Sequence, residues 1–235
     1  MKKIKPIKYF KNSDEINEVL DTLEAEYPDA GCALHHDSIF HLLLAVVLSA
    51  QTTDASVNTV TPELFSTYHE PADLSAADIN DVEDIIKKLG LYKNKAKNLV
   101  GIGKLLCSEY DGVVPQDFTE LQKLPGVGRK TANVVLSVGF GEQHIAVDTH
   151  VFRVTNRIGL VDEDNVLKTE RSLMEIIPKH RWSHMHHVFI FHGRRCCTAR
   201  KPKCESCCIA DKCKYNNLIL CLIFMRLRKA PKIAT

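Results

Sequence analysis

Cysteines near the C-terminus are the residues whose spacing most clearly suggests chemistry. The chain has 235 residues and nine cysteines, six of which lie within residues 196–213. Four of them follow the spacing C-x6-C-x2-C-x5-C, namely Cys197, Cys204, Cys207 and Cys213. Four thiolates in one short loop can hold an iron–sulfur cluster or a zinc ion, and the single C-x2-C pair favours a 4Fe-4S cluster. Cys196 and Cys208 are spare, so a shifted ligand register stays open.

Basic side chains surround this loop with no acid between them. They are Arg194, Arg195, Arg200, Lys201 and Lys203. They can neutralise the negative charge of a metal site, or a loop held rigid by metal can direct them at DNA phosphates, and both interpretations can hold together. The net charge of the whole chain is only +2, so any basic DNA-binding surface must be local.

Four histidines precede the cysteine loop. They are His184, His186, His187 and His192. No carboxylate or cysteine within their own spacing completes a ligand set, so we interpret them as structural residues.

A glycine-rich turn at residues 124–130, with the sequence LPGVGRK, is the second pattern with chemical meaning. Gly126 and Gly128 permit positive φ and let backbone N–H groups approach a phosphate at a helix N-terminus. A bare turn of this kind also serves as a simple corner between two helices. Arg129 and Lys130 favour anion binding, because cations in the first turn of a helix oppose its dipole unless an anion binds there.

Lys130 also has the properties of a covalent catalyst. A lysine close to a helix N-terminus and partly shielded from water is shifted toward the neutral amine, which is a nucleophile and forms Schiff bases. The alternative is one more phosphate-binding lysine. Asp148 stands eighteen residues further on, before a predicted helix, where most aspartates act only as N-caps. It can instead face the lysine, stabilise a developing cation and manage protons.

The elements that position these residues are predicted to be helices, because apolar residues recur at helical spacing behind capping residues. Six predicted helices start after Asn12, at Asp37 or Ser38, at Asp54, after Ser75, at Asp148 and at Asn165. Three further helices are predicted to cover residues 94–110, 129–140 and 183–192. The very apolar segment 42–48 is expected to lie in the centre of a core. The one extended stretch, residues 144–147, is too short for a sheet. We therefore expect an all-α protein.

Composition excludes several classes of protein. Hydrophobic residues make up 45% and charged residues 26%, as in ordinary globular chains. The longest apolar runs, 42–48 and 218–225, are far shorter than the ~20 residues that span a bilayer. The basic N-terminus is not followed by the apolar segment of a secretory signal. We expect a cytoplasmic protein that is not secreted, in a compartment that keeps cysteines reduced.

In their order along the chain, these motifs resemble the endonuclease III family, the helix–hairpin–helix DNA glycosylases with lyase activity and an iron–sulfur cluster. The resemblance rests on residues 124–135, 145–154 and 192–194 and on the cysteine loop, with 48–54 and 90–96 in the expected order. It covers roughly residues 15 to 215. The combination of hairpin, aspartate motif and cysteine spacing is highly specific, and Lys130 together with the cysteine loop points to this family.

The resemblance implies a two-lobed, all-α fold with DNA bound in a cleft between the lobes. A six-helix barrel lobe carrying the helix–hairpin–helix is expected at residues 32–142. An iron–sulfur cluster lobe is expected at residues 1–31 and 143–215. Residues 216–235 form an atypical C-terminal tail, because members of the family ordinarily end soon after the fourth cysteine, and we assign this tail no role in catalysis.

The implied activity is that of a bifunctional DNA glycosylase and AP lyase of base excision repair, which removes oxidised pyrimidines from duplex DNA. Lys130 would attack C1′ of the sugar and form a Schiff base, Asp148 would be the catalytic carboxylate, and β-elimination would cut the strand. Gln51 and Leu91 would fill and wedge the stack that the flipped nucleotide leaves. Taken alone, they would be interpreted as a polar helix end and a core leucine.

The resemblance further implies the ligands and partners. DNA contacts are expected from Gln51, Leu91, Gly126, Gly128, Arg129, Arg194 and Lys201, and a 4Fe-4S cluster on Cys197, Cys204, Cys207 and Cys213. The expected partner is damaged double-stranded DNA, bound by a monomer that is nucleoid-associated if bacterial, with no membrane partner and no small-molecule substrate. The alternatives are a non-catalytic, metal-stabilised DNA-binding module, or a related glycosylase that prefers mismatched adenine or pyrimidine dimers.

Overall fold

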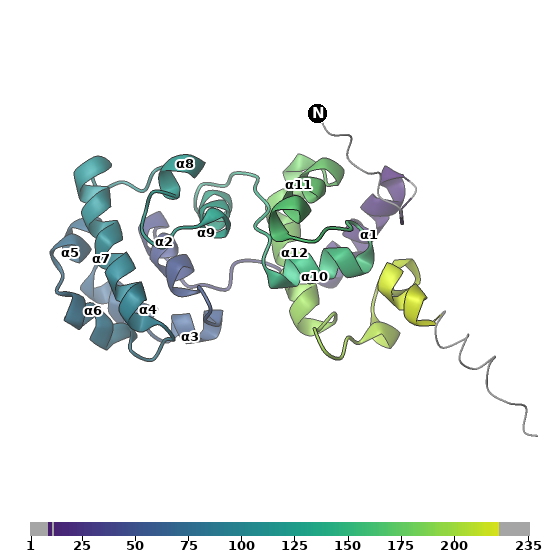
Figure 1. Ribbon diagram of the computed structural model, residues 1–235, viewed down its shortest axis with the longest axis horizontal. Coiled ribbons are helices and arrows are strands. Elements are labelled where there is room, and N and C mark those ends of the chain that lie inside the picture. Colours follow the sequence, from purple (N-terminus) through teal and green to yellow (C-terminus); the bar gives the residue numbers. More distant parts are fainter. Residues whose placement is uncertain (1–8, 11, 221–235) are drawn as a thin grey trace, which may run out of the picture. The chain divides into compact units, whose positions relative to one another are not determined.

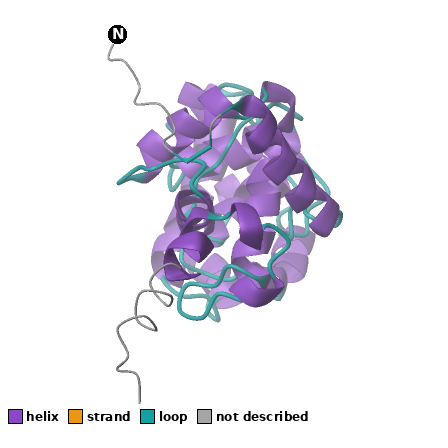
Figure 2. Cartoon of the chain, turned by 90° about the vertical axis from the view of Figure 1, so that its right-hand side faces the viewer, coloured by secondary structure: helices purple, strands orange, loops and turns teal. Residues whose placement is uncertain are grey.

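Every regular element is a helix in the part of the chain that the structure, a computed structural model, describes, which is residues 9–10 and 12–220 (Figures 1 and 2). The prediction of an all-α protein is confirmed. The chain divides into two compact units, one of Cys32–Ala146 and one that joins Met1–Gly31 to Val147–Thr235. The first eight residues, and residues 221–235 of the atypical tail, lie outside the described residues. The described start of that tail, residues 216–220, is helical.

The unit Cys32–Ala146 is built around a central apolar helix. Its helices are α2 (Ile39–Leu48), α3 (Asp54–Asn58), α4 (Thr61–Thr67), α5 (Pro71–Ala76), α6 (Ile79–Ile86), α7 (Tyr92–Glu109), α8 (Phe118–Leu121) and α9 (Arg129–Val134), which continues into the π-helical turn η1 (Val135–Gly139). Every residue of α2 after Ile39 is buried, because α7, α9 and η1 pack around it. The predicted central position of this segment is confirmed.

Two helices of this unit approach each other at a glycine. Gly103 of α7 lies against α5, and a Cβ atom built on it would be 2.7 Å from the backbone nitrogen of Ser75 and 2.9 Å from the carbonyl carbon of Leu74. Both neighbours are backbone atoms, which cannot move aside as a flexible side chain can. The close packing of α5 on α7 therefore requires glycine at this position.

Local capping signals place most helix starts where the sequence predicts them. Asn12, Ser38, Asp148 and Asn165 each accept hydrogen bonds from backbone N–H groups of the first turn that follows. The prediction for Ser75 is wrong. Ser75 lies inside α5, which begins with a capping box of Glu70 and Asp73, and Asp78 caps the next helix. The α5 segment is too short to show helical periodicity, so the sequence pattern predicts a single helix start where the structure has two, those of α5 and α6.

The second unit brings the two halves of its chain together through three long helices. Its elements are α1 (Ser13–Glu26), α10 (Thr149–Ile158), α11 (Val166–Ile176), η2 (Lys179–Arg181), α12 (Trp182–Arg195), η3 (Cys204–Ser206) and η4 (Ala210–Lys212). α12 packs against both α10 and α1. Arg181, just before α12, forms ion pairs of 2.8 Å with Asp21 and with Glu24 of α1. The N-terminal helix is thereby fixed to the last long helix of the unit.

Among the described residues, none of the helices combines the length and the apolar character that crossing a bilayer demands.

We predict that Gly103→Ala destabilises the protein, because the added methyl group forces α5 away from α7. Overpacking of this kind costs about 1–3 kcal/mol, so the thermal midpoint should fall by several degrees. Gly31→Ala is the matched control, since a Cβ atom there meets nothing within 4 Å. Equal midpoints for the two variants would show that the α5–α7 contact is not tight.

Candidate functional site

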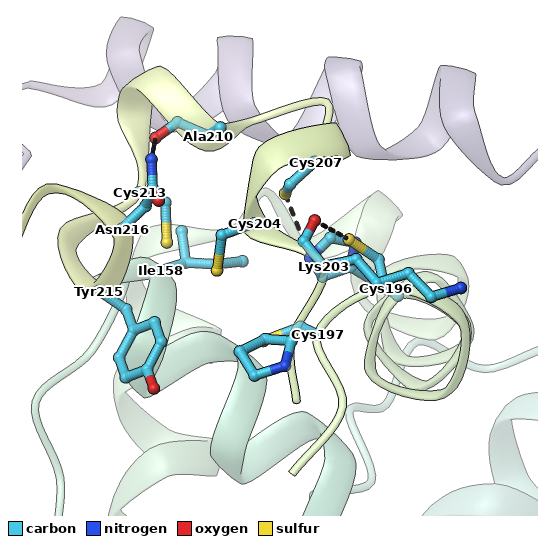
Figure 3. Close-up of a pocket in the computed structure, with 12 residues that line it drawn as sticks. Ile158, Cys196, Cys197, Lys203, Cys204, Cys207, Ala210, Cys213, Tyr215 and Asn216 are labelled. Atoms are coloured by element: carbon cyan, nitrogen blue, oxygen red, sulfur yellow. Dashed lines mark hydrogen bonds between the residues drawn. The ribbon is translucent and has the colours of Figure 1, made fainter. Parts of the chain in front are cut away.

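Five cysteine side chains line one pocket in the unit that contains both chain ends (Figure 3). They are Cys196, Cys197, Cys204, Cys207 and Cys213. Ile158, His192 and Tyr215 contribute to the same wall. The structure thus brings together the four cysteines predicted as ligands and adds Cys196. Cys208 is exposed and is not among the residues that line the pocket.

The backbone around the pocket has little regular structure of its own. Between Cys197 and Cys213 only the three-residue turns η3 and η4 are helical. Arg157 of α10 supports the loop: its guanidinium donates to the carbonyls of Thr198 at 2.7 Å and Ala199 at 2.8 Å. The same group lies 3.6 Å from Cys197 Sγ. Arg157 thus places a positive charge beside the sulfurs, a role that the sequence pattern did not reveal.

The donor set fits a soft metal centre. Burial raises the pKa of the Cys204 and Cys213 thiols, whereas hydrogen bonds from Cys208 and His192 lower the pKa of Cys207. All the cysteines can become thiolates together only if a cation compensates their charge. Sulfur ligands in a partly apolar pocket beside a guanidinium match the requirements of an iron–sulfur cluster, and equally those of zinc.

His192 is a pocket residue that sequence reasoning interpreted as structural. It is buried at the end of α12, with Nδ1 3.0 Å from Tyr27 Oη and Nε2 3.9 Å from Cys207 Sγ. Its ring nitrogen and the sulfurs of Cys196 and Cys207 all lie within 4.8 Å of one another. The signal that could have identified it is its position, one helical turn before Cys196 on the same helix.

The hairpin lies in the other unit, between α8 and α9. Gly126 has φ of 76°, and a Cβ atom there would lie 2.6 Å from Asn98 Nδ2 of α7, so this position requires glycine. Gly128 differs from the expectation: its φ is −93°, and it is the N-cap of α9. It contributes open space, since a Cβ atom there meets nothing within 4 Å. The guanidinium of Arg129 stacks over the ring of Phe118 at 4.9 Å.

Lys130 lies in the first turn of α9, in the unit Cys32–Ala146. Asp148 is the N-cap of α10 and belongs to the other unit. The Lys130 side chain is exposed, so the protein alone does not give the shielding from water that the sequence argument expected. Asp148 is half-buried and caps α10, with Oδ1 accepting from the N–H groups of His150 and Val151 at 2.8 Å each. The N-cap interpretation of Asp148 is confirmed, and the two hydrogen bonds fix the orientation of its carboxylate.

Gln51 and Leu91 share an unusual backbone conformation within the unit Cys32–Ala146. Their φ angles are 55° and 59°, in the left-handed region that side chains other than glycine rarely adopt. Gln51 is exposed in the turn after α2, and Leu91 is 57% exposed immediately before α7. The interpretation of Leu91 as a core residue is wrong. Strain combined with exposure of a large apolar side chain is typical of a functional position.

Several basic residues near the cysteine loop lie at the surface. Arg194 and Lys201, both predicted to contact DNA, are exposed, and so is Arg195. Arg195 forms a two-pronged ion pair with Asp29, with distances of 3.0 and 2.7 Å. Arg195 therefore links the end of α12 to the segment after α1.

Two families match the chain. Residues 44–179 match the family described as HhH-GPD superfamily base excision DNA repair protein. Residues 197–213 match the iron–sulfur binding domain of endonuclease III. This second match starts at Cys197 and ends at Cys213, the first and last of the predicted ligands. It favours iron–sulfur over zinc, so the cofactor prediction of a 4Fe-4S cluster is confirmed.

Relatives and solved structures agree with these matches. Endonuclease III of Bacillus subtilis is 48% identical over 86% of this chain and 93% of its own length, and that of Escherichia coli K12 is 44% identical over 86% and 96%. A trapped endonuclease III–DNA covalent intermediate superposes with a TM-score of 0.85 at 48% identity, covering 90% of this chain and all of that one. A non-covalent endonuclease III–DNA complex gives a TM-score of 0.84 at 47% identity, covering 94% and 100%. With both its helix–hairpin–helix region and its cysteine loop matched, the chain belongs to the endonuclease III family of base excision repair DNA glycosylases.

Proposed function

We propose that this chain excises oxidised pyrimidines from duplex DNA and cuts the strand through a Schiff base on Lys130. Membership of the endonuclease III family makes the chain a DNA glycosylase and AP lyase that acts on DNA. One observation carries the finer proposal: a similar structure, 48% identical, is an endonuclease III trapped in a covalent intermediate with DNA. A covalent intermediate needs a nucleophile, and Lys130 supplies an amine on the hairpin.

The proposed reaction uses one amine for both steps. The neutral Lys130 Nζ attacks C1′ of the extruded sugar, and the bond from C1′ to the base breaks with its electron pair leaving on the base. The aminal left at C1′ loses a proton from its nitrogen, and the C1′–O4′ bond then breaks while O4′ takes a proton, which opens the sugar and gives the iminium. The iminium acidifies the C2′ proton, whose loss breaks the C3′–O bond, expels the 3′ phosphate and cuts the strand. Because Lys130 is exposed in the protein, bound DNA would have to exclude water from this amine.

Asp148 would stabilise the cation that develops at the sugar. Its carboxylate is already oriented by two N–H groups at 2.8 Å, so no reorganisation is needed when the charge appears. The same carboxylate therefore serves as helix cap and as electrostatic stabiliser. The N-cap role that the structure shows is compatible with this proposal and supports it.

The proposed DNA contacts fall into three sets. Gln51 and Leu91, both exposed on strained backbone, would occupy the stack that the damaged nucleotide leaves. Gly126, Gly128 and Arg129 of the hairpin would bind phosphates through backbone N–H groups and a guanidinium. Arg194 and Lys201 would bind phosphates beside the cysteine loop.

The cluster ligands are proposed to be Cys197, Cys204, Cys207 and Cys213, which all line the pocket of Figure 3. A bound 4Fe-4S cluster supplies the cross-link that closes a loop otherwise held by few backbone contacts. Cys196 also lines the pocket but donates its Sγ proton to the Lys203 carbonyl at 3.6 Å, which assigns it a loop-stabilising role. Cys208 is exposed.

We also propose the domain assignment and the setting of the activity. The six-helix barrel lobe would correspond to the unit Cys32–Ala146, ending four residues beyond the predicted boundary at 142. The iron–sulfur lobe would correspond to the unit that holds both chain ends. The protein would act as a monomer on damaged duplex DNA, in the cytoplasm and nucleoid-associated if bacterial, without a membrane partner or a small-molecule substrate.

We predict that borohydride traps a covalent protein–DNA adduct on a duplex containing thymine glycol, and that Lys130→Ala abolishes it. Lys123→Ala is the control, because Lys123 is an exposed lysine just before the hairpin. The measurement is a denaturing gel of the reduced complex. An adduct that survives in Lys130→Ala would show that another amine is the nucleophile, and a wild-type protein that forms none would favour a non-catalytic DNA-binding module.

We predict that Asp148→Asn keeps the N-cap of α10 but removes the negative charge of the side chain. Asparagine is as good an N-cap as aspartate, so the free energy of unfolding should change by less than about 0.5 kcal/mol. Single-turnover excision should slow by about 10²–10³-fold, because a preorganised charge at the developing cation is lost. Asp148→Ala should lose both activity and stability. Wild-type excision by Asp148→Asn would reduce Asp148 to a cap.

Replacement of the cysteines by serine tests the ligand set. Cys197→Ser, Cys204→Ser, Cys207→Ser and Cys213→Ser should each lose the brown colour and most of the roughly four iron atoms per chain, since every ligand closes the same cluster. Cys208→Ser and Cys107→Ser are exposed controls that should keep the iron. Iron analysis and visible spectroscopy report the result. A colourless, zinc-containing wild type would contradict the cluster.

A further inference from the structure

A buried lysine outside the proposed catalytic pair lies in α7. Lys95 is only 4% exposed, although lysine is among the residues least often buried, and burial lowers the pKa of its ammonium. Its Nζ donates a hydrogen bond to Thr52 Oγ1 at 2.5 Å. No carboxylate of residues 9–10 or 12–220 forms an ion pair with it in the structure. A buried ammonium with this single hydroxyl partner is costly, so its position needs an explanation.

The hydroxyl that Lys95 contacts is part of the turn that carries Gln51. Thr52 Oγ1 accepts from Lys95 and donates in turn to the carbonyl oxygen of Ala50 at 3.4 Å. That carbonyl belongs to the peptide group that enters Gln51, whose φ is 55°. The Lys95 ammonium therefore reaches, through one hydroxyl, the peptide plane next to a strained residue.

The backbone of Lys95 connects to a second strained residue. Its N–H donates to the carbonyl oxygen of Leu91 at 3.1 Å, which is the first helical hydrogen bond of α7. Leu91 has φ of 59° and no side-chain cap supports it. Lys95 is thus bonded through its main chain to Leu91 and through its side chain to the Gln51 turn. These are the two left-handed positions proposed to enter the DNA stack.

We propose that Lys95 is a positioning residue that, together with Thr52, fixes the Gln51 turn to the start of α7. The two side chains would then meet the DNA as a preformed pair, and the strain at both residues would be held before binding. This inference rests on the proposed roles of Gln51 and Leu91. It assigns Lys95 no contact with the reacting atoms: its effect is on extrusion of the nucleotide.

The test uses substitutions that remove the hydrogen bond and keep the shape. Lys95→Met removes the donor, Thr52→Val removes the hydroxyl, and Thr52→Ser keeps it. Extrusion is measured by the fluorescence of 2-aminopurine placed opposite an abasic-site analogue in a duplex saturated with protein, and reaction by the rate of borohydride trapping on an abasic duplex. Lys104→Met is the matched control, because Lys104 is exposed on the same helix.

We expect Lys95→Met and Thr52→Val each to lose most of the fluorescence rise and to slow trapping at saturation about tenfold, the size of effect typical of a hydrogen bond to a charged group. The double variant should be no slower than either single one, since both remove the same link. Thr52→Ser and Lys104→Met should stay within about twofold of wild type on both readouts.

Gln51→Ala and Leu91→Ala in the same assay distinguish the possible failures. If they leave the fluorescence unchanged, their proposed roles fail, and the inference fails with them. If they reduce it and Thr52→Val does not, the inference alone is overturned. A loss confined to Lys95→Met, together with a lowered thermal midpoint, would show a merely structural lysine and would also overturn it. A wild type without any adduct would overturn the proposed function itself.

Discussion

The unit that contains both chain ends depends on one constraint: several thiolates must be held together in the cysteine loop, which has almost no secondary structure. Regular backbone hydrogen bonding contributes little here, because η3 and η4 are only three residues long. Metal–thiolate bonds replace it, and α10 provides the frame. Asp148 caps the N-terminus of this helix, and Arg157 in its last turn holds the cysteine loop. The same helix thus carries the proposed catalytic carboxylate at its start and the support of the cysteine loop in its last turn.

In the unit Cys32–Ala146, α7 is the helix that supports segments proposed to touch DNA. Leu91 stands at its start, and the side chain of Lys95 reaches the Gln51 turn. Asn98 lies against Gly126 of the hairpin and leaves no room there for a Cβ atom. Three positions of this unit that are proposed to touch DNA have positive φ, namely Gln51, Leu91 and Gly126. The Gln51 turn and Gly126 lie against α7, and Leu91 is its N-cap. One helix therefore sets the spacing of loops that come from distant parts of the sequence.

The sequence predicts those features of the fold and site whose causes are local. N-caps such as Asn12 and Asn165 and the cysteine spacing depend on residues a few positions apart, and the family matches confirm the cluster. Ser75 was misplaced because α5 is too short to show a period. The sequence does not reveal the contacts of His192 with Tyr27 and Cys207, which are 165 and 15 residues away, although its spacing from Cys196 is a local signal. Nor does it reveal those of Arg157, whose partners are 40 to 42 residues away. The roles of Lys130 and Asp148 stay predictions, since they depend on bound DNA.

The two units differ in how their residues are ordered along the chain, and this has a consequence for synthesis on the ribosome. Cys32–Ala146 is continuous, so its core can close as soon as that segment has emerged. α1 is made first, yet the helix it packs against, α12, is among the last. The N-terminal helix must therefore wait, with its apolar face uncovered, until α12 has been made. The cysteines of the loop follow α12 and are made later still, so the set of metal ligands is complete only after the packing partner of α1 has emerged.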